Sequence, residues 1–176
     1  LPGDTVVVSA AAGGVGSIAL QLAGLSNCKS IGIAGGPAKC QRLREELGAG
    51  AAIDYKNADL VAELAAASPS GINVMFDNVG GSILDAVLIN LAPFGRIAVC
   101  GGIGGYDSPN IAVHNTTLLT QHNGMIKGFW YTDYQHLFTR ALQRLSDWLQ
   151  SGQLIELIDV SHGFDQVPEA TRGIFY

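Results

Sequence analysis

The sequence has few charged residues and few aromatic ones. Of its 176 residues, 14% are charged, 7% are aromatic and 48% are hydrophobic. This balance excludes a disordered chain, because such chains combine low hydrophobicity with high charge. The net charge is −5 and no basic cluster is present, so we expect no nucleic-acid partner. No apolar run reaches the roughly 18 residues that a membrane span requires, so we expect no membrane partner either.

Cysteine is also scarce. Cys28, Cys40 and Cys100 are scattered and odd in number, which is typical of free thiols in a reducing compartment. No signal peptide is visible, so a cytoplasmic location is expected. The sequence has no His-Glu-x-x-His, no clustered Cys or His residues and no nucleophile elbow, and its histidines are isolated. We therefore expect no metal site.

The most informative stretch, residues 5–25, has the pattern of a strand, a turn of small residues and a helix. The apolar β-branched residues Val6 to Val8 come first, and small residues from Ala10 to Gly14 follow. From Val15 onward, apolar residues recur three and four positions apart, which is the helical spacing. This order presents a helix N-terminus to a bound phosphate, and in that context a glycine pattern indicates dinucleotide binding.

Ala11, Gly13 and Gly16 occupy the three positions of the G-x-G-x-x-G pattern, so alanine replaces the first glycine. Gly13 leaves room for the backbone to approach a pyrophosphate, and Gly16 lets the helix pack closely on the strand. Ala11 requires a turn that stays at negative φ. The alternative is a plain strand–helix turn that uses small residues only for packing.

Strand and helix patterns alternate along the rest of the chain. We expect further strands at 30–35, 51–54, 72–77, 95–101, 125–129 and near 155–161, helices at 37–48, 58–67, 81–91, 133–151 and from 166, and a glycine-rich loop at 101–117. The apolar and aromatic stripe of the 133–151 helix is expected in the core. The alternation predicts an α/β fold, a Rossmann-type doubly wound parallel sheet in the order 3-2-1-4-5-6, with helices on both faces. Ligands then bind at the carboxyl ends of the strands.

The segment expected to meet the adenosine ribose lacks an acid. NAD-preferring sites place Asp or Glu about 20 residues after the glycine turn. Here that stretch is Ala34-Gly-Gly-Pro-Ala-Lys39, so a 2′-phosphate is permitted and Lys39 supplies positive charge near a helix N-terminus. Arg42 is a second candidate contact. The sequence therefore favours NADP, the alternative being that Lys39 is an ordinary solvated lysine.

Tyr55 and Asn78 follow the third and fourth expected strands. The Tyr55 hydroxyl is a candidate donor to the same phosphate, or its ring flanks the adenine, unless it is an ordinary half-buried tyrosine. Asn78 offers amide groups to a ribose or nicotinamide, or else serves as a helix N-cap. Tyr106, on the glycine-rich loop, is a candidate proton donor, with a loop tyrosine packed on the surface as the alternative.

Several segments resemble the zinc-independent medium-chain dehydrogenase/reductases. They are Val-Val-Val-Ser-Ala-Ala-Ala-Gly-Gly-Val-Gly-Ser at 6–17, Ala-Gly-Gly-x-x-Lys-Cys at 34–40, Glu-Glu-Leu-Gly-Ala at 45–49, Ala-Ile-Asp-Tyr-Lys-Asn at 52–57 and Phe-Asp-Asn-Val-Gly-Gly at 76–81. The branch that the chain resembles most is that of the prostaglandin reductases and alkenal double-bond reductases. The resemblance covers almost the whole chain.

The resemblance implies an NADPH-dependent reductase of the C=C bond in α,β-unsaturated aldehydes and ketones. In that family the residues matching Lys39 and Tyr55 bind the 2′-phosphate, and the asparagine matching Asn78 lies near the nicotinamide ribose. A loop tyrosine donates the proton or orients the substrate, and Tyr106 matches it. The family loop usually has Ile-Ser-x-Tyr, whereas this chain has Ile103-Gly-Gly-Tyr106. The full set of expected cofactor contacts is Ala11, Gly13, Gly14, Val15, Gly16, Gly35, Lys39, Tyr55, Asn78, Cys100 and Gly101.

The resemblance also implies that residues 1–176 are the NADP-binding Rossmann domain of a larger reductase, without its N-terminal GroES-like domain and its final strand. The first residue is Leu1, and Tyr176 lies within an apolar pattern, which agrees with an excised domain. The expected partner is a small-molecule enone or quinone, and because the family commonly forms dimers, a homodimer is one expectation. Two alternatives stay open: an NADPH quinone reductase, and a non-catalytic NADP-binding regulatory module.

Overall fold

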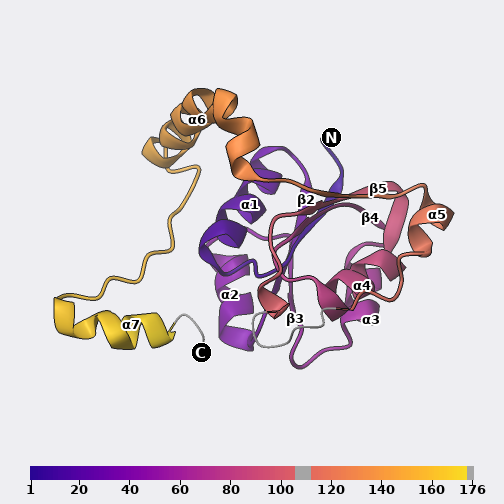
Figure 1. Cartoon of the computed structure of the whole chain (residues 1–176), viewed down its shortest axis with the longest axis horizontal. Coiled ribbons are helices and arrows are strands. Elements are labelled where there is room, and N and C mark those ends of the chain that lie inside the picture. Colours follow the sequence, from indigo (N-terminus) through magenta and orange to yellow (C-terminus); the bar gives the residue numbers. More distant parts are fainter. Residues whose placement is uncertain (106–111, 174–176) are drawn as a thin grey trace.

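The computed structural model describes residues 1–105 and 112–173, and its centre is a six-stranded sheet (Figure 1). The strands lie in the order β3-β2-β1-β4-β5-β6, and every neighbouring pair is parallel. They are β1 Thr5–Val8, β2 Lys29–Ala34, β3 Ala51–Asp54, β4 Ile72–Asp77, β5 Leu91–Val99 and β6 Met125–Gly128. The predicted Rossmann-type fold and its strand order are confirmed.

Helices connect the strands. They are α1 Gly14–Leu25, α2 Pro37–Glu45, α3 Leu60–Ala67, α4 Gly81–Ile89, α5 Leu118–His122, α6 Phe138–Gln150 and α7 Val167–Gly173. Short 3-10 turns cover Ile103–Gly105, Tyr131–Leu137 and Phe164–Gln166. Among the residues described, no helix combines the length and the apolar character needed to cross a membrane.

The core has two parts because successive residues of a strand point to opposite faces of the sheet. Val7 and its neighbours pack with α3 and α4, for example through Leu64 and Val87. Val8 faces the other way and packs with α1 and α2, through Leu20 and Leu43. Figure 1 shows α1 and α2 on one side of the sheet and α3 and α4 on the other. Helices therefore cover both faces, as predicted.

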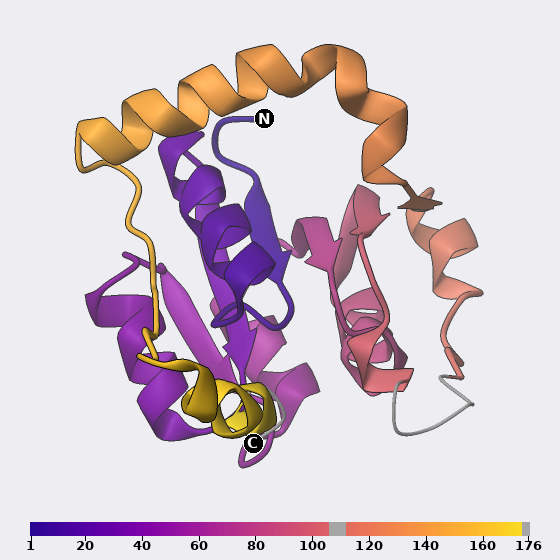
Figure 2. The same ribbon diagram turned by 60° about the vertical axis from the view of Figure 1, so that its left-hand side comes forward.

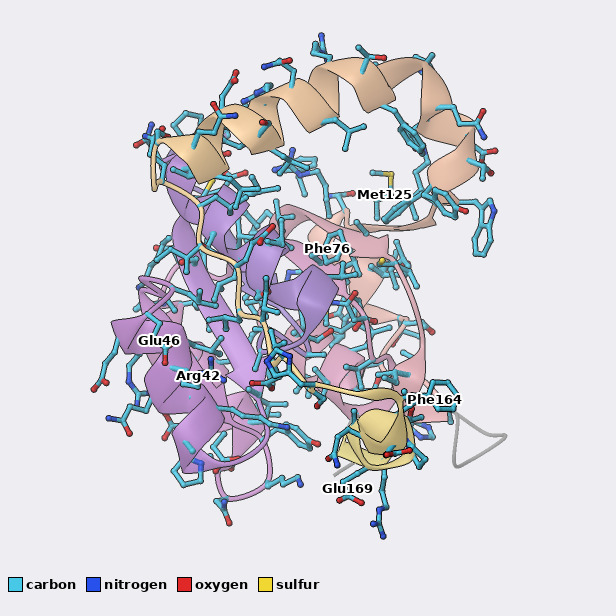
Figure 3. The ribbon with its side chains drawn as sticks, turned by 90° about the vertical axis from the view of Figure 1, so that its left-hand side faces the viewer. Arg42, Glu46, Phe76, Met125, Phe164 and Glu169 are labelled. Atoms are coloured by element: carbon cyan, nitrogen blue, oxygen red, sulfur yellow. The ribbon has the colours of Figure 1, made fainter. Side chains whose placement is uncertain are left out.

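The apolar stripe predicted to lie in the core along residues 133–151 does not lie there. No residue of α6 is buried, and Leu142 is 64% exposed. Figure 2 shows α6 passing over one end of the sheet and α1, rather than packed among the other helices. Residues of β4, β5 and β6, together with Tyr134, line an open hollow of about 400 Å³. Figure 3 shows Met125 and Phe76 on the side of the sheet that faces α6. Helical periodicity reveals that a face is apolar but not that another element covers it.

The strand predicted near 155–161 is also wrong, because this described segment runs without strand pairing. The backbone groups of Ile155 form hydrogen bonds with the Gln21 side chain instead of with another strand. The Gln21 amide donates to the Ile155 carbonyl at 3.0 Å and accepts from the Ile155 N–H at 2.8 Å. Leu154 is buried beside them. The segment is thus fixed to α1 by one glutamine, and the predicted final helix follows it as α7.

Candidate functional site

Three helix N-termini lie at the carboxyl edge of the sheet without a side-chain cap. Gly13, Gly36 and Gly80 are the N-caps of α1, α2 and α4, and none of these helices has an acidic residue in its first turn. In α3, by contrast, the Asp59 carboxylate accepts from two backbone N–H groups. The first backbone N–H groups of a helix have no partner within it. The N–H groups that follow the capping glycine therefore stay available for an anion, most fully in α1. In α2 and α4 the N–H of the capping glycine itself already donates to the carboxylate of Asp54 or Asp77, and Pro37 of α2 has no N–H.

The turn from β1 to α1 is built for close approach. A Cβ on Gly16 would lie 2.2 Å from the carbonyl oxygen of Ala10, so only glycine fits there. The packing role predicted for Gly16 is confirmed. Gly13 adopts φ −84° and ψ 170°, and Gly14 and Val15 are exposed at the start of α1.

Ala11 is fully buried and is not among the residues of positive φ, as the sequence predicted. The left-handed residue is its neighbour Ala10, at φ 48°. Sequence reasoning missed this, because alanine gives no signal for a conformation that usually favours glycine.

The predicted ribose-side residues gather at the ends of β2 and β3. Lys39 lies exposed in the first turn of α2, and its side chain has no ion pair within the described part of the chain. Tyr55 is 44% exposed. A Cβ on Gly35 would lie 3.1 Å from the Tyr55 ring, so the two loops touch. Arg42, the second candidate cation, points instead to Glu46, with Nε 3.0 Å from a carboxylate oxygen (Figure 3).

Sequence reasoning missed two residues at this edge. The Asp54 carboxylate accepts from the backbone N–H groups of Gly36 and Lys56 and from the Asn57 amide. These bonds, that of Asn57 first, hold the pKa of Asp54 below its ordinary value. The Lys56 side chain lies over Gly35, since a Cβ there would meet its Cε at 3.0 Å. Asp54 and Lys56 come just after the apolar residues of β3, and this position at a strand end was the sequence feature that could have identified them.

A second polar cluster joins β1 to β4, at the point where the strand order reverses. Ser9 donates to Oδ1 of Asp77 at 2.8 Å, and both side chains are fully buried. The N–H groups of Val79 and Gly80 donate to the same oxygen, at 3.0 and 3.1 Å. Asp77 Oδ2 is buried and has no hydrogen-bond partner in the described structure. The cluster fixes the turn that follows β4.

Asn78 is held by this cluster. Its backbone N–H donates to the Ser9 hydroxyl and its amide nitrogen donates to the Ser9 carbonyl, both at 2.8 Å. The side-chain oxygen is left as the group able to accept from a ligand. Asn78 is not the N-cap of α4, because Gly80 occupies that position. The alternative capping role is therefore wrong.

The backbone N–H groups of Cys100 and Gly101 both donate to the Asp77 carbonyl, which ties the end of β5 to the same place. Burial, and then the Asp77 carboxylate, raise the pKa of the Cys100 thiol. This keeps the thiol protonated at neutral pH and argues against a nucleophilic role. Tyr106, the predicted proton donor, lies outside the described residues.

A family profile described as zinc-binding dehydrogenase matches residues 14–147. A 2-alkenal reductase (NADP(+)-dependent) of Nicotiana tabacum is 39% identical over 175 residues, which cover 98% of this chain and 51% of that protein. Prostaglandin reductase 1 of Mus musculus is 36% identical over 182 residues, covering 98% and 53%. The crystal structure of CurA in complex with NADPH from Vibrio vulnificus matches with a TM-score of 0.89 at 35% identity, covering 98% of this chain and 53% of that chain.

The chain spans about half the length of the curated relatives it matches. Within residues 1–105 and 112–173, no group of three or more His, Cys, Asp or Glu is placed to hold a metal ion. The described residues thus offer no zinc site. The profile match covers most of the chain, and the relatives are named as reductases. The chain therefore belongs to the zinc-binding dehydrogenase family.

Proposed function

We propose that this chain is the cofactor-binding part of an NADPH-dependent oxidoreductase that reduces the C=C bond of α,β-unsaturated aldehydes and ketones. The observation that carries the proposal is the carboxyl edge of the sheet. Three glycine-capped helix N-termini meet there, with an exposed Lys39 on one of them and no acid in its first turn. The names of the relatives, 2-alkenal reductase and prostaglandin reductase, support the choice of reaction.

The residues present fit an NADP molecule. The open N–H groups of α1, from Gly14 to Gly16, would bind the pyrophosphate, because the helix N-terminus carries partial positive charge. Gly16 lets the helix come close to the turn without a Cβ in the way. Lys39 and Tyr55 would bind the 2′-phosphate.

The contacts to the nicotinamide half would come from Asn78, Cys100 and Gly101, which gather around Asp77. Ala11, Gly13, Val15 and Gly35 complete the proposed contact set. When bound, NADPH supplies a hydride for the β-carbon of the substrate. The protein's own part is to hold the nicotinamide ribose through the Asn78 side-chain oxygen and to supply a proton. We assign the proton donor to Tyr106, whose phenol suits protonation of an enolate.

Residues 1–176 are proposed as the NADP-binding domain of a larger reductase, in the cytoplasm. A homodimer is proposed as well, because the reductases that the chain resembles commonly form dimers. A quinone reductase, and a regulatory module that binds NADP without catalysis, are the competing functions. All three functions share the contacts to the cofactor phosphates. They differ only in the substrate, if any, that binds beside the nicotinamide.

One assay separates these functions. The full-length protein is mixed with NADPH and 2-nonenal, and then with a benzoquinone, while absorbance at 340 nm is followed. We expect the wild-type protein to oxidise NADPH in the presence of the enal. The Tyr106→Phe variant is expected to have a kcat more than about tenfold lower. Turnover with the quinone alone would favour the quinone reductase, and no turnover with either would favour the regulatory module. An unchanged rate in Tyr106→Phe would remove that residue from the reaction.

A further inference from the structure

Asp54 ties together two loops that come from different strands. Its Oδ1 atom accepts from the Gly36 N–H at 2.8 Å, across the sheet edge from β3 to the β2–α2 turn. The same atom accepts from the Lys56 N–H at 3.1 Å, within its own loop. Its other oxygen accepts from the Asn57 amide at 2.7 Å. One carboxylate thus holds the β2–α2 turn at a fixed distance from the β3–α3 loop.

Each of these loops carries one proposed ligand of the 2′-phosphate. Gly36 is the N-cap of α2 and has φ 94°, and Lys39 follows in the first turn of that helix. Tyr55 is the next residue after Asp54 and packs against Gly35. A small rotation of either loop would therefore change the distance between the ammonium group and the phenol.

We propose that Asp54 is a positioning residue that sets the spacing of Lys39 and Tyr55 and so determines the preference for a 2′-phosphorylated dinucleotide. This inference rests on the proposed function, since it concerns the same cofactor site. Asp54 is not itself a ligand of the cofactor and acts through the two residues it places. Its charge does not mark an NAD site, because the acid of such a site comes about 20 residues after the glycine turn, whereas Asp54 lies at the end of β3.

The competing view is that the carboxylate simply repels a phosphate. The two views predict opposite changes in NADPH affinity when the carboxylate is removed. If repulsion dominates, removing the carboxylate strengthens NADPH binding. If positioning dominates, removal weakens NADPH binding and leaves NADH almost unchanged, because NADH has no group for Lys39 and Tyr55 to bind. Positioning is expected to dominate, because three donors already surround the carboxylate, and solvent still screens the charge of this half-buried side chain.

The test compares the affinities of NADPH and NADH in the full-length protein by fluorescence titration. Asp54→Ala removes all three hydrogen bonds that the carboxylate accepts, and it is expected to lower the NADPH-to-NADH affinity ratio by about tenfold. Asp54→Asn keeps an oxygen for both backbone N–H groups, so the ratio is expected to stay within about threefold of the wild type. Asp59→Ala is the matched control, since it removes a nearby carboxylate that caps α3 and does not bond to the β2–α2 turn.

The outcomes are distinct. A wild-type protein that prefers NADPH, together with an Asp54→Ala variant whose preference is unchanged or stronger, would overturn the positioning role alone. An equal loss for both nucleotides would overturn it too, because the carboxylate would then support the fold in general. A wild-type protein without any preference for NADPH would overturn the proposed cofactor itself.

Discussion

Gly16 shows how a single hydrogen atom in place of a side chain shapes the turn between β1 and α1. A Cβ there would lie 2.2 Å from the oxygen and 2.8 Å from the carbon of the Ala10 carbonyl, which is backbone and unable to move aside cheaply. Gly16→Ala is expected to lower the free energy of unfolding by about 3 kcal/mol, measured by urea denaturation. Gly14→Ala is the control, because a Cβ at Gly14 would meet nothing within 4 Å. Equal stability of the two variants would contradict this packing.

Asp54 also predicts a pH dependence of stability. Its pKa in the folded chain lies below the ordinary value of 3.8, so the carboxylate is favoured in the folded state. The stability it contributes is complete above the ordinary pKa and disappears as the pH falls through the lowered one. The difference in unfolding free energy between the wild type and Asp54→Ala is therefore expected to be constant from pH 7 to 5 and to shrink below 3.8. A difference that does not shrink in acid would show that these hydrogen bonds do not depend on the charge.

The sequence could predict which residues end the strands, but not how they bond to one another. The loops that carry Lys39 and Tyr55 do touch, with Tyr55 against Gly35, because parallel strands bring their carboxyl ends to one edge. The bonds from Asp54 to Gly36 and from Asp77 to Ser9 depend on side-chain rotamers, and no spacing rule reveals those. The positive φ of Ala10 likewise arises from its surroundings rather than from its own preference.

At the scale of elements, the spacing of hydrophobic residues predicted the helices and strands correctly where two elements pack against each other. It located β1 to β5 and the helices α1 to α4, because each contributes buried apolar residues to the core. It also located β6, although no residue of that strand is buried. It was misleading for α6, whose stripe is apolar but not buried in the described structure. It was misleading again after residue 154, where the Gln21 side chain replaces a neighbouring strand as hydrogen-bond partner.

The uncapped end of α1 allows a test of the proposed pyrophosphate site. Gly13→Asn and Gly13→Asp both introduce a good N-cap of the same shape, so both are expected to support the helix equally. Only aspartate brings a negative charge that repels a phosphate. Gly13→Asp is expected to bind NADPH and NADH at least about tenfold more weakly than Gly13→Asn, with similar melting temperatures. Equal affinities in titration would argue that the anion lies elsewhere.

At the scale of the whole molecule, the proposed site is assembled from segments far apart in sequence. The ends of β1 and β4 supply the central cluster, and the ends of β2 and β3 supply the ribose side. The fold brings them together through its strand order alone, which is why the architecture could be predicted before any contact was known. The substrate could not be predicted in the same way, because the chain spans only about half the length of its curated relatives.

The central claim is that this edge of the sheet recognises a 2′-phosphate through Lys39. Its most direct test is a titration of wild-type and Lys39→Ala full-length protein with NADPH and with NADH. We expect the variant to lose at least about tenfold in NADPH affinity while its NADH affinity stays unchanged. Equal losses for the two nucleotides, or no loss for either, would contradict the claim.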